Sequence, residues 1–186
     1  MFIGRERMAL ESAAYGLTAQ DLDGACYQVT SPVVYTEFEA LRSAQLVLVT
    51  VKALDLQTLL SQLTQYLSAD CLVVAMQNGV AIAPLYQQFL SQPVLRAIVP
   101  FNVVKISPGF YARTTGAEMI WQKSDDPRIQ AVLEQLHHQG ITSKQLENVK
   151  AAEFGKLMLN LNNAINALSD LPLQQQLLQR PYRLLL

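Results

Sequence analysis

The sequence predicts an α/β fold in which helices cover both faces of a mainly parallel β-sheet, followed by the start of an all-α domain. Three apolar runs have the length of buried strands, and amphipathic stretches with helical periodicity separate them. From Glu147 onward the pattern is purely helical. We therefore expect a first domain over residues 1–147 and a second domain over residues 148–186.

The first expected strand is residues 45–51, QLVLVTV, a continuous apolar run typical of a strand buried on both faces. Asp55 then stands near the N-cap of an amphipathic helix with the sequence LQTLLSQLTQYL. Residues 71–76, CLVVAM, form the second buried strand, and a Gln-Asn-Gly turn follows at residues 77–79. Short connections between such elements are typical of βαβ units with right-handed crossovers.

The pattern continues with a short helix over residues 82–90 and a third strand over residues 93–99. Glycines and a Pro-Gly pair then separate short β-type runs over residues 101–122. We expect these runs to be antiparallel strands on the edge of the sheet. Residues 127–138 are expected to form a helix that begins after the Asp125-Asp126 pair.

The composition argues against several classes of protein. Hydrophobic residues make up 51% of the 186 residues and charged residues 16%, so the chain has enough apolar side chains for a sizeable core. A net charge of −1 provides no electrostatic footprint for nucleic acid, and the apolar runs are too short to span a bilayer. The N-terminus lacks the basic region and apolar stretch of a signal peptide, so we expect a cytoplasmic protein.

The cysteines and histidines indicate neither a disulfide framework nor a metal site. Cys71 opens an apolar run and is expected to be a reduced core residue, and Cys26 is the only other cysteine. His137 and His138 are adjacent near the end of an expected helix, and the sequence offers no further ligands at a suitable spacing. The sequence also contains no Gly-X-Ser-X-Gly motif and no phosphate-binding P-loop.

The helix expected over residues 148–168 carries a polar stripe. With Lys156 at 0° and about 100° per residue, Asn160 lies at about 40° and Asn163 at about −20°. Amides donate and accept hydrogen bonds and a lysine can give up a proton, so the stripe suits a small ligand with carbonyl and carboxylate groups. A solvated helix face is the alternative, although such faces usually carry charged residues rather than asparagine, a poor helix former. The far side of the helix is apolar and suited to a core, with Leu157, Met158, Leu161, Ile165 and Leu168.

Polar residues follow two of the expected parallel strands. Lys52 comes directly after LVLVTV, and Asn78 is the second residue after CLVVAM. Ligands of open parallel sheets bind beyond the carboxyl ends of the strands, so we expect both residues at one ligand site. Each has a plainer explanation by itself, because a lysine at a strand end is often only solvated and Asn-Gly is a common turn.

Four segments carry a family resemblance: IGRERM at 3–8, VTVKA at 49–53, QNGV at 77–80 and EFGKLMLNLNNAINAL at 153–168. In residues, order and spacing they resemble the ketopantoate reductase (2-dehydropantoate 2-reductase) family. The resemblance covers the whole chain and implies a Rossmann-like, NADP-binding first domain. It also implies NADPH-dependent reduction of a 2-oxo acid, ketopantoate, to pantoate, on the route to pantothenate and coenzyme A.

The resemblance assigns roles to residues around the expected substrate. Lys156 matches the general acid that protonates the carbonyl oxygen as hydride arrives. Asn78 matches the asparagine between the nicotinamide ribose and the substrate, and Asn160 matches a substrate-binding asparagine. Some members have another asparagine eight positions after the lysine, where this chain has Ala164, so the neighbouring Asn163 is our further substrate-binding candidate.

The resemblance also assigns cofactor contacts. Arg5 follows the end of the second Rossmann strand, where an arginine selects the 2′-phosphate of NADP. Lys52 resembles the family's cofactor-contacting lysine, and Val103 falls where a backbone contact to the cofactor is expected. Without the family, Arg5 would be an ordinary surface arginine in an Arg-Glu-Arg cluster.

Two segments typical of that family have no counterpart in this sequence. We find no Gly-X-Gly-X-X-Gly turn after a first strand, and only 18 residues follow the helix expected over residues 148–168. We therefore expect part of a longer enzyme, without strand one of the order 3-2-1-4-5-6 and without most of the C-terminal domain. The loss of strand one would leave an open apolar edge beside Leu46–Val51, which a homodimer or another partner chain would cover.

Three functional interpretations stay open from the sequence. The first is the ketopantoate reductase type of oxidoreductase. The second is a non-catalytic protein that keeps a ligand-binding or partner-binding surface without the cofactor cradle. The third keeps the oxidoreductase fold for another 2-oxo acid or for another two-domain dehydrogenase, such as one acting on hydroxy acids or glycerol phosphate.

Overall fold

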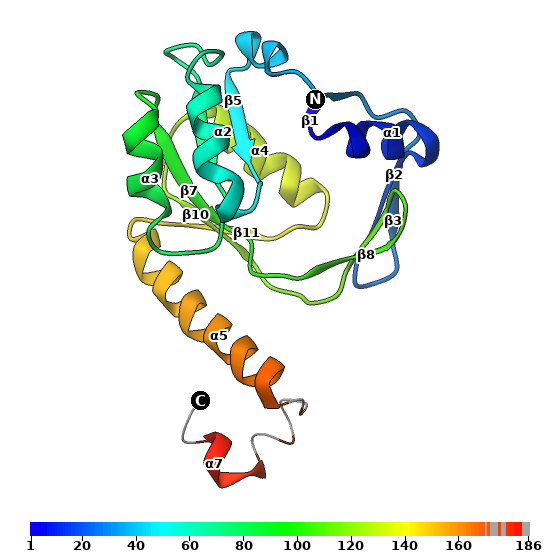
Figure 1. Cartoon of the computed structure of the whole chain (residues 1–186), viewed down its shortest axis with the longest axis vertical. Coiled ribbons are helices and arrows are strands. Elements are labelled where there is room, and N and C mark those ends of the chain that lie inside the picture. Colours follow the sequence, from blue (N-terminus) through cyan, green and yellow to red (C-terminus); the bar gives the residue numbers. More distant parts are fainter. Residues whose placement is uncertain (170, 172–174, 176–177, 184–186) are drawn as a thin grey trace.

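A five-stranded sheet forms the centre of the protein, as seen in a computed structural model of the chain (Figure 1). The structure describes residues 1–169, 171, 175 and 178–183, apart from the side chains of residues 159, 162–167, 182 and 183. The sheet runs in the order β11 (Ser143–Leu146), β10 (Met119–Gln122), β7 (Val94–Ile98), β6 (Leu72–Ala75) and β5 (Leu46–Val49). Strands β5, β6 and β7 are parallel, as the sequence predicts.

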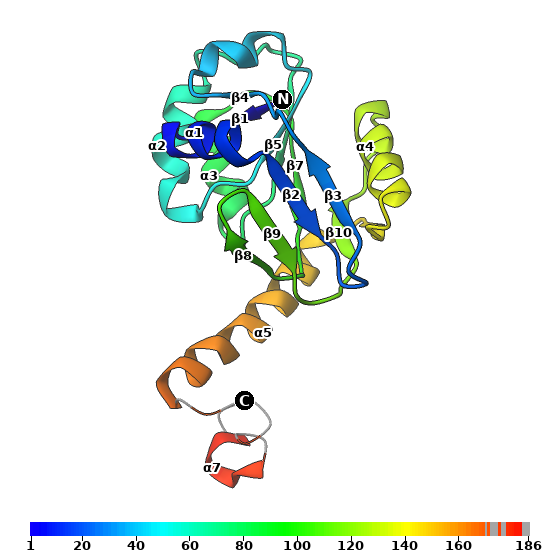
Figure 2. The ribbon, with the colours of Figure 1, turned by 90° about the vertical axis from the view of Figure 1, so that its right-hand side faces the viewer.

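Helices pack on both faces of this sheet, which confirms the predicted α/β layers (Figure 2). Helices α2 (Leu56–Leu63) and α3 (Ile82–Phe89) cover one face, and α4 (Pro127–His138) covers the other. Side chains alternate along β6, so Val73 and Ala75 pack toward α2 and α3 while Leu72 and Val74 pack toward α4. All four are buried, which explains why this strand has no polar positions.

The predicted starts of two helices are confirmed in position, but the two aspartates differ in function. Asp126 caps α4, because its carboxylate accepts a hydrogen bond of 2.9 Å from the backbone N–H of Arg128. Asp55 occupies the N-cap position of α2 after the short 3₁₀ helix η2 (Ala53–Asp55), yet makes no capping hydrogen bond. Its carboxylate pairs with Arg5 instead.

The cysteines also lie as expected. Cys71 is buried directly before β6 and is not in a disulfide, and burial raises the pKa of its thiol. Cys26 is free and exposed.

The expectation for residues 101–122 is wrong in part. Strand β10 does run antiparallel to β7, but it lies inside the sheet because β11 pairs with its other side. Residues 103–113 instead belong to a second, four-stranded sheet in the order β3 (Cys26–Val29), β2 (Leu17–Gln20), β9 (Phe110–Arg113) and β8 (Val103–Ser107). The partner strand β2 lies some 90 residues earlier in the chain, so local turn signals do not indicate this pairing.

The N-terminal segment lies beside β5 but does not extend the central sheet. Strand β1 (Phe2–Ile3) pairs in parallel with β4 (Val34–Tyr35), and α1 (Glu6–Tyr15) and η1 (Phe38–Ser43) complete this region. Within the part of the chain that the structure describes, β5 has a strand neighbour on one side only. A mostly apolar groove of about 800 Å³ follows its other side toward β1, which agrees with the predicted open edge.

Helix α5 (Val149–Ser169) begins against β7 and β10 and then projects away from the sheet (Figures 1 and 2). Its expected core side is largely uncovered: Leu157 is half-buried, but Met158, Leu161 and Leu168 are exposed. The short helix α7 (Arg180–Arg183) lies beyond it. The boundary expected at residue 147 falls between β11 and α5, and the division into two domains stays a prediction.

Candidate active site

One cavity of about 220 Å³ lies where the carboxyl ends of β6 and β7 meet the first turns of α5. This is the side of an open parallel sheet where ligands bind. Its lining combines the turn after β6, the interior of β7 and one side of α5. The lining residues are Gln77, Asn78, Gly79, Arg96, Ile98, Glu153, Lys156, Leu157 and Asn160.

The turn at residues 77–79 brings Asn78 to this cavity. Gly79 has a φ of 118°, a conformation that side-chain-bearing residues rarely adopt, so glycine is needed here. Gln77 anchors the turn from inside: its Nε2 donates to the carbonyl of Val49 at 2.9 Å, and the Tyr86 hydroxyl donates to its Oε1 at 3.1 Å. The predicted turn is therefore fixed to both β5 and α3.

Lys156 is half-buried on α5 and lines the same cavity. Its Nζ donates a hydrogen bond to the carbonyl of Val99, the residue after β7. Burial lowers the pKa of the amine from its ordinary value, because removal from water disfavours the charged form. The geometry thus places an ammonium group with a weakened hold on its proton at the end of the parallel strands.

The structure describes the Lys156 and Asn160 side chains of the predicted polar stripe. Asn160 lies one turn after Lys156, is half-buried and lines the cavity, so lysine and amide do share one side of α5. The side chain of Asn163 lies outside those that the structure describes.

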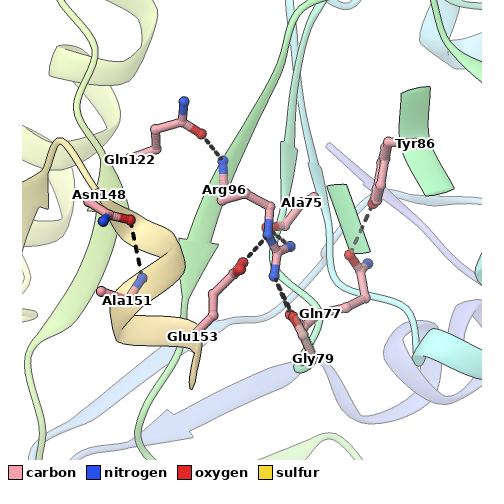
Figure 3. Close-up of polar contacts among 9 residues, drawn as sticks. All are labelled: Ala75, Gln77, Gly79, Tyr86, Arg96, Gln122, Asn148, Ala151 and Glu153. Atoms are coloured by element: carbon pink, nitrogen blue, oxygen red, sulfur yellow. Dashed lines mark hydrogen bonds and ion pairs between the residues drawn. The ribbon is translucent and has the colours of Figure 1, made fainter. Parts of the chain in front are cut away.

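The sequence reasoning missed a buried ion pair at this site. Arg96 in β7 and Glu153 in α5 both line the cavity, and their side chains are only 4% and 8% exposed. The Arg96 Nε lies 2.5 Å from Glu153 Oε1 (Figure 3). A charged residue inside the apolar run PVLRAIV was the signal available for Arg96, since an arginine is rarely buried without a partner.

The three other predicted cofactor residues lie apart from this cavity. Arg5 follows β1, is 82% exposed and pairs with Asp55 at 2.9 Å. Lys52 is exposed at the N-cap of η2, three residues before Asp55, so both cations lie near the carboxyl end of β5. Val103 begins β8 and is exposed in the second sheet.

The cavity suits a small polar molecule. It is smaller than the roughly 300–1,000 Å³ of typical drug-sized ligand pockets. Its lining includes the Lys156 amine and three side-chain amides, of which that of Gln77 is already hydrogen-bonded to Val49 and Tyr86. Because Arg96 neutralises Glu153, the lining does not carry an uncompensated negative charge that would repel a carboxylate. A carbonyl next to a carboxylate matches this arrangement of donors.

Neither a metal site nor a membrane-spanning helix is found in the described part of the chain. No group of three or more His, Cys, Asp or Glu residues that could hold a metal ion occurs within the described residues. In the same part of the chain, none of the helices is both long and apolar enough to cross a membrane.

Comparison with protein families matches residues 1–126 to the family described as "Ketopantoate reductase PanE/ApbA". A search of the curated proteins returns no significant match. Residues Lys156 and Asn160 lie beyond the matched segment, so the match does not bear on their roles.

Several solved structures share the fold. A PanE/ApbA family ketopantoate reductase from Ralstonia eutropha JMP134 is 24% identical, with a TM-score of 0.83 over 96% of this chain and 59% of its own. A putative ketopantoate reductase from Ralstonia solanacearum MolK2 is 20% identical, with a TM-score of 0.83 over 97% of this chain and 63% of its own. A 2-dehydropantoate 2-reductase from Geobacter metallireducens GS-15 is 19% identical, with a TM-score of 0.79 over 92% of this chain and 58% of its own. The chain thus spans about three fifths of the length of these proteins.

Proposed function

The chain belongs to the ketopantoate reductase family, and we propose that it carries the substrate-reducing centre of an NADPH-dependent 2-dehydropantoate 2-reductase. One observation carries the proposal: Lys156 and Asn78 line a single small cavity although they lie 78 residues apart in the sequence. The cavity lies at the carboxyl ends of parallel strands, where this class of fold binds its ligands.

Lys156 acts in this proposal as the general acid. Its protonated amine donates to the oxygen of the substrate's 2-oxo group, so that negative charge does not build up on that oxygen as the carbonyl is reduced. Burial supports the role because a lowered pKa makes proton release from the amine easier near neutral pH. The carbonyl of Val99 holds Nζ at the cavity during this step.

Asn78 and Asn160 orient the substrate in this proposal. Their amide N–H groups can donate to the carboxylate of a 2-oxo acid from two elements, the turn after β6 and helix α5. Asn163 stays a further candidate. Fixed donors on two sides of a small molecule restrict its rotation and hold its carbonyl near Lys156.

The cofactor residues of the proposal are Arg5, Lys52, Asn78 and Val103. The exposed guanidinium of Arg5 and the exposed amine of Lys52 fit a phosphate-bearing dinucleotide, since both lie near the carboxyl end of β5. The 220 Å³ cavity is too small for a whole dinucleotide, so only its reactive end would reach Asn78. When bound, NADPH supplies the hydride.

The proposal is tested with the purified chain by following ketopantoate-dependent oxidation of NADPH. Lys156→Ala should lower turnover by about 10²–10⁴-fold, the range expected when a general acid is lost. Lys150→Ala is the matched control, because Lys150 is exposed on the same helix.

Near-normal turnover in Lys156→Ala would remove Lys156 from the chemistry. Binding of ketopantoate by the wild-type chain, with no measurable NADPH binding and no turnover, would favour the non-catalytic interpretation, whereas tight NADPH binding would exclude it. Faster turnover of another 2-oxo acid in a substrate panel would keep the reaction class and change the substrate.

A further inference from the structure

Arg96 is a buried arginine in the middle of the central sheet, and every contact of its guanidinium leads to the candidate active site. Nε pairs with Glu153 at 2.5 Å, and Nη1 donates to the carbonyl of Ala75 at 2.7 Å. Nη2 donates to the carbonyls of Gln77 at 2.9 Å and Gly79 at 3.4 Å (Figure 3). One planar group thus bridges β6, the turn after it and helix α5.

On the side of the sheet, these contacts fix the position of Asn78. Gln77 and Gly79 flank Asn78, and Arg96 holds the backbone carbonyl of each. The side chain of Gln77 is held separately by Val49 and Tyr86. The backbone on both sides of Asn78 therefore has little freedom to move.

On the side of the helix, the same guanidinium fixes the position of Lys156. Glu153 lies three residues before Lys156, close to one turn of helix. Among the described residues, helix α5 packs on the sheet through its first turns and then projects outward (Figure 1). A bond at Glu153 therefore controls how close Lys156 lies to the turn that carries Asn78.

We propose that Arg96 and Glu153 are positioning residues of the reductase site, which hold the Asn78 turn and the Lys156 helix at a fixed separation. This inference rests on the proposed function for its catalytic consequence but on the contacts above for its geometry. A shift of about 1 Å between groups that act on one substrate can cost about 10²-fold in rate. A purely structural ion pair would affect folding and leave the turnover of the folded protein unchanged.

Two substitutions in the full chain separate these roles. Arg96→Gln removes the charge and most donors. Arg96→Lys keeps a cation for Glu153, but a single ammonium cannot span the carbonyls of Ala75, Gln77 and Gly79. We expect kcat for NADPH oxidation to fall about 100-fold in Arg96→Gln and at least about tenfold in Arg96→Lys, with a smaller change in KM.

The matched control is Arg113→Lys in β9. Arg113 forms another ion pair, with Asp21, and both side chains are largely buried, but it belongs to the second sheet. The kcat of Arg113→Lys should stay within about twofold of wild type, since the Arg113–Asp21 pair touches neither the turn at residues 77–79 nor α5. Circular dichroism shows which variants are folded. Wild-type kcat in folded Arg96→Lys would overturn the proposal.

A second measurement does not depend on turnover. Arg96 from β7 and Glu153 from α5 are the charged groups that line the cavity with Lys156. In Arg96→Gln, Glu153 loses its partner and its negative charge acts on Lys156, so acetylation of Lys156 should reach half-maximum at a higher pH. Acetylation of Lys156 by acetic anhydride, measured by mass spectrometry over a pH series, reports this midpoint, and Arg113→Lys should not move it.

The two measurements distinguish the possible failures. A shifted midpoint in a chain without turnover would support the positioning role and count against the proposed function. An unchanged midpoint in folded Arg96→Gln would overturn the positioning role whatever the activity.

Discussion

An arginine holds backbone carbonyls at each end of the central sheet, but the two arginines differ in burial and in how far along the chain their acidic partners lie. Arg96, near the carboxyl ends, is 4% exposed and pairs with Glu153, 57 residues away. Arg128, near the amino ends, is 29% exposed and pairs with Asp126, two residues away. Its Nη1 donates to the carbonyls of Gln45 at 2.8 Å and of Asp70 at 2.7 Å.

The difference shows how one chemical arrangement serves two purposes. The local pair at Arg128 fixes the start of α4 against the starts of β5 and β6, and it stays in contact with water. The distant pair at Arg96 joins elements that the chain itself does not connect, in a place where an unpaired charge is costly. We therefore expect the carboxyl-end pair to matter more for both stability and function.

The largest expected effect is on the stability that Arg96 provides. Arg96→Met should lower the free energy of unfolding by about 3–5 kcal/mol, because it leaves Glu153 buried without a partner. Arg128→Met should cost less, since water can replace part of its contacts. Urea unfolding of both variants measures the comparison.

A double substitution sharpens this result. Arg96→Met with Glu153→Leu should lose less stability than Arg96→Met alone, because no unpaired charge remains. If Arg128→Met proved as destabilising as Arg96→Met, burial would not be what separates the two ends of the sheet.

The sequence predicts well those parts of the fold whose signals are local. The parallel strands β5 and β6 are continuous apolar runs, and β7 is an apolar run interrupted by Arg96. The Asn-Gly turn and the Asp126 cap depend on adjacent residues. Strand β11 was not predicted, because SKQL is a polar segment that becomes a strand through pairing with β10. The predicted core side of α5 is exposed because, within the described residues, the helix leaves the sheet after its first turns.

The same distinction applies to the site. Lys156, Asn160 and Asn78 could be selected from a helical period and a strand end. Their meeting in one cavity, and the role of Arg96 between them, depend on contacts across 57 residues of chain that no spacing in the sequence encodes.

A second arginine at the carboxyl ends allows a test of cofactor selection. Arg5 is exposed and uses one donor for Asp55, which leaves others for a 2′-phosphate. Arg5→Ala should weaken NADPH binding by at least about tenfold, since a charge-assisted hydrogen bond contributes about 1.5–3 kcal/mol, and should change NADH binding far less. Titration of both cofactors measures this, with Arg7→Ala as the control for a nearby exposed arginine. Equal losses for NADPH and NADH would exclude the proposed role.

The open side of β5 contrasts with its closed side against β6. Leu48 is 42% exposed on this edge strand, and unpaired strand edges with apolar side chains associate. We expect the chain to self-associate. Leu48→Lys should lower the association constant by about tenfold, which corresponds to about 1.4 kcal/mol. Analytical ultracentrifugation over a concentration series measures it. Leu54→Lys is the control, because Leu54 is an exposed leucine in η2 and not in β5. A wild-type chain that stays monomeric throughout would contradict the expectation.

The smallest expected effect is pH-dependent and lies at the amino end of the sheet. The Arg128 guanidinium lowers the pKa of Asp126 to about 2. A lowered carboxyl pKa stabilises the folded chain above the unfolded value of about 4 and loses this effect as the pH falls from about 4 to about 2. Asp126→Asn should therefore lower Tm at pH 7, and its difference from wild type should shrink over that acid range. Asparagine still caps a helix, so the change isolates the charge. Asp125→Asn is the matched control, since it leaves both Asp126–Arg128 contacts in place. A Tm difference for Asp126→Asn that stayed constant down to pH 2 would mean that the carboxylate charge of this partly exposed pair does not stabilise the folded chain, unlike the charge of the buried pair at Arg96.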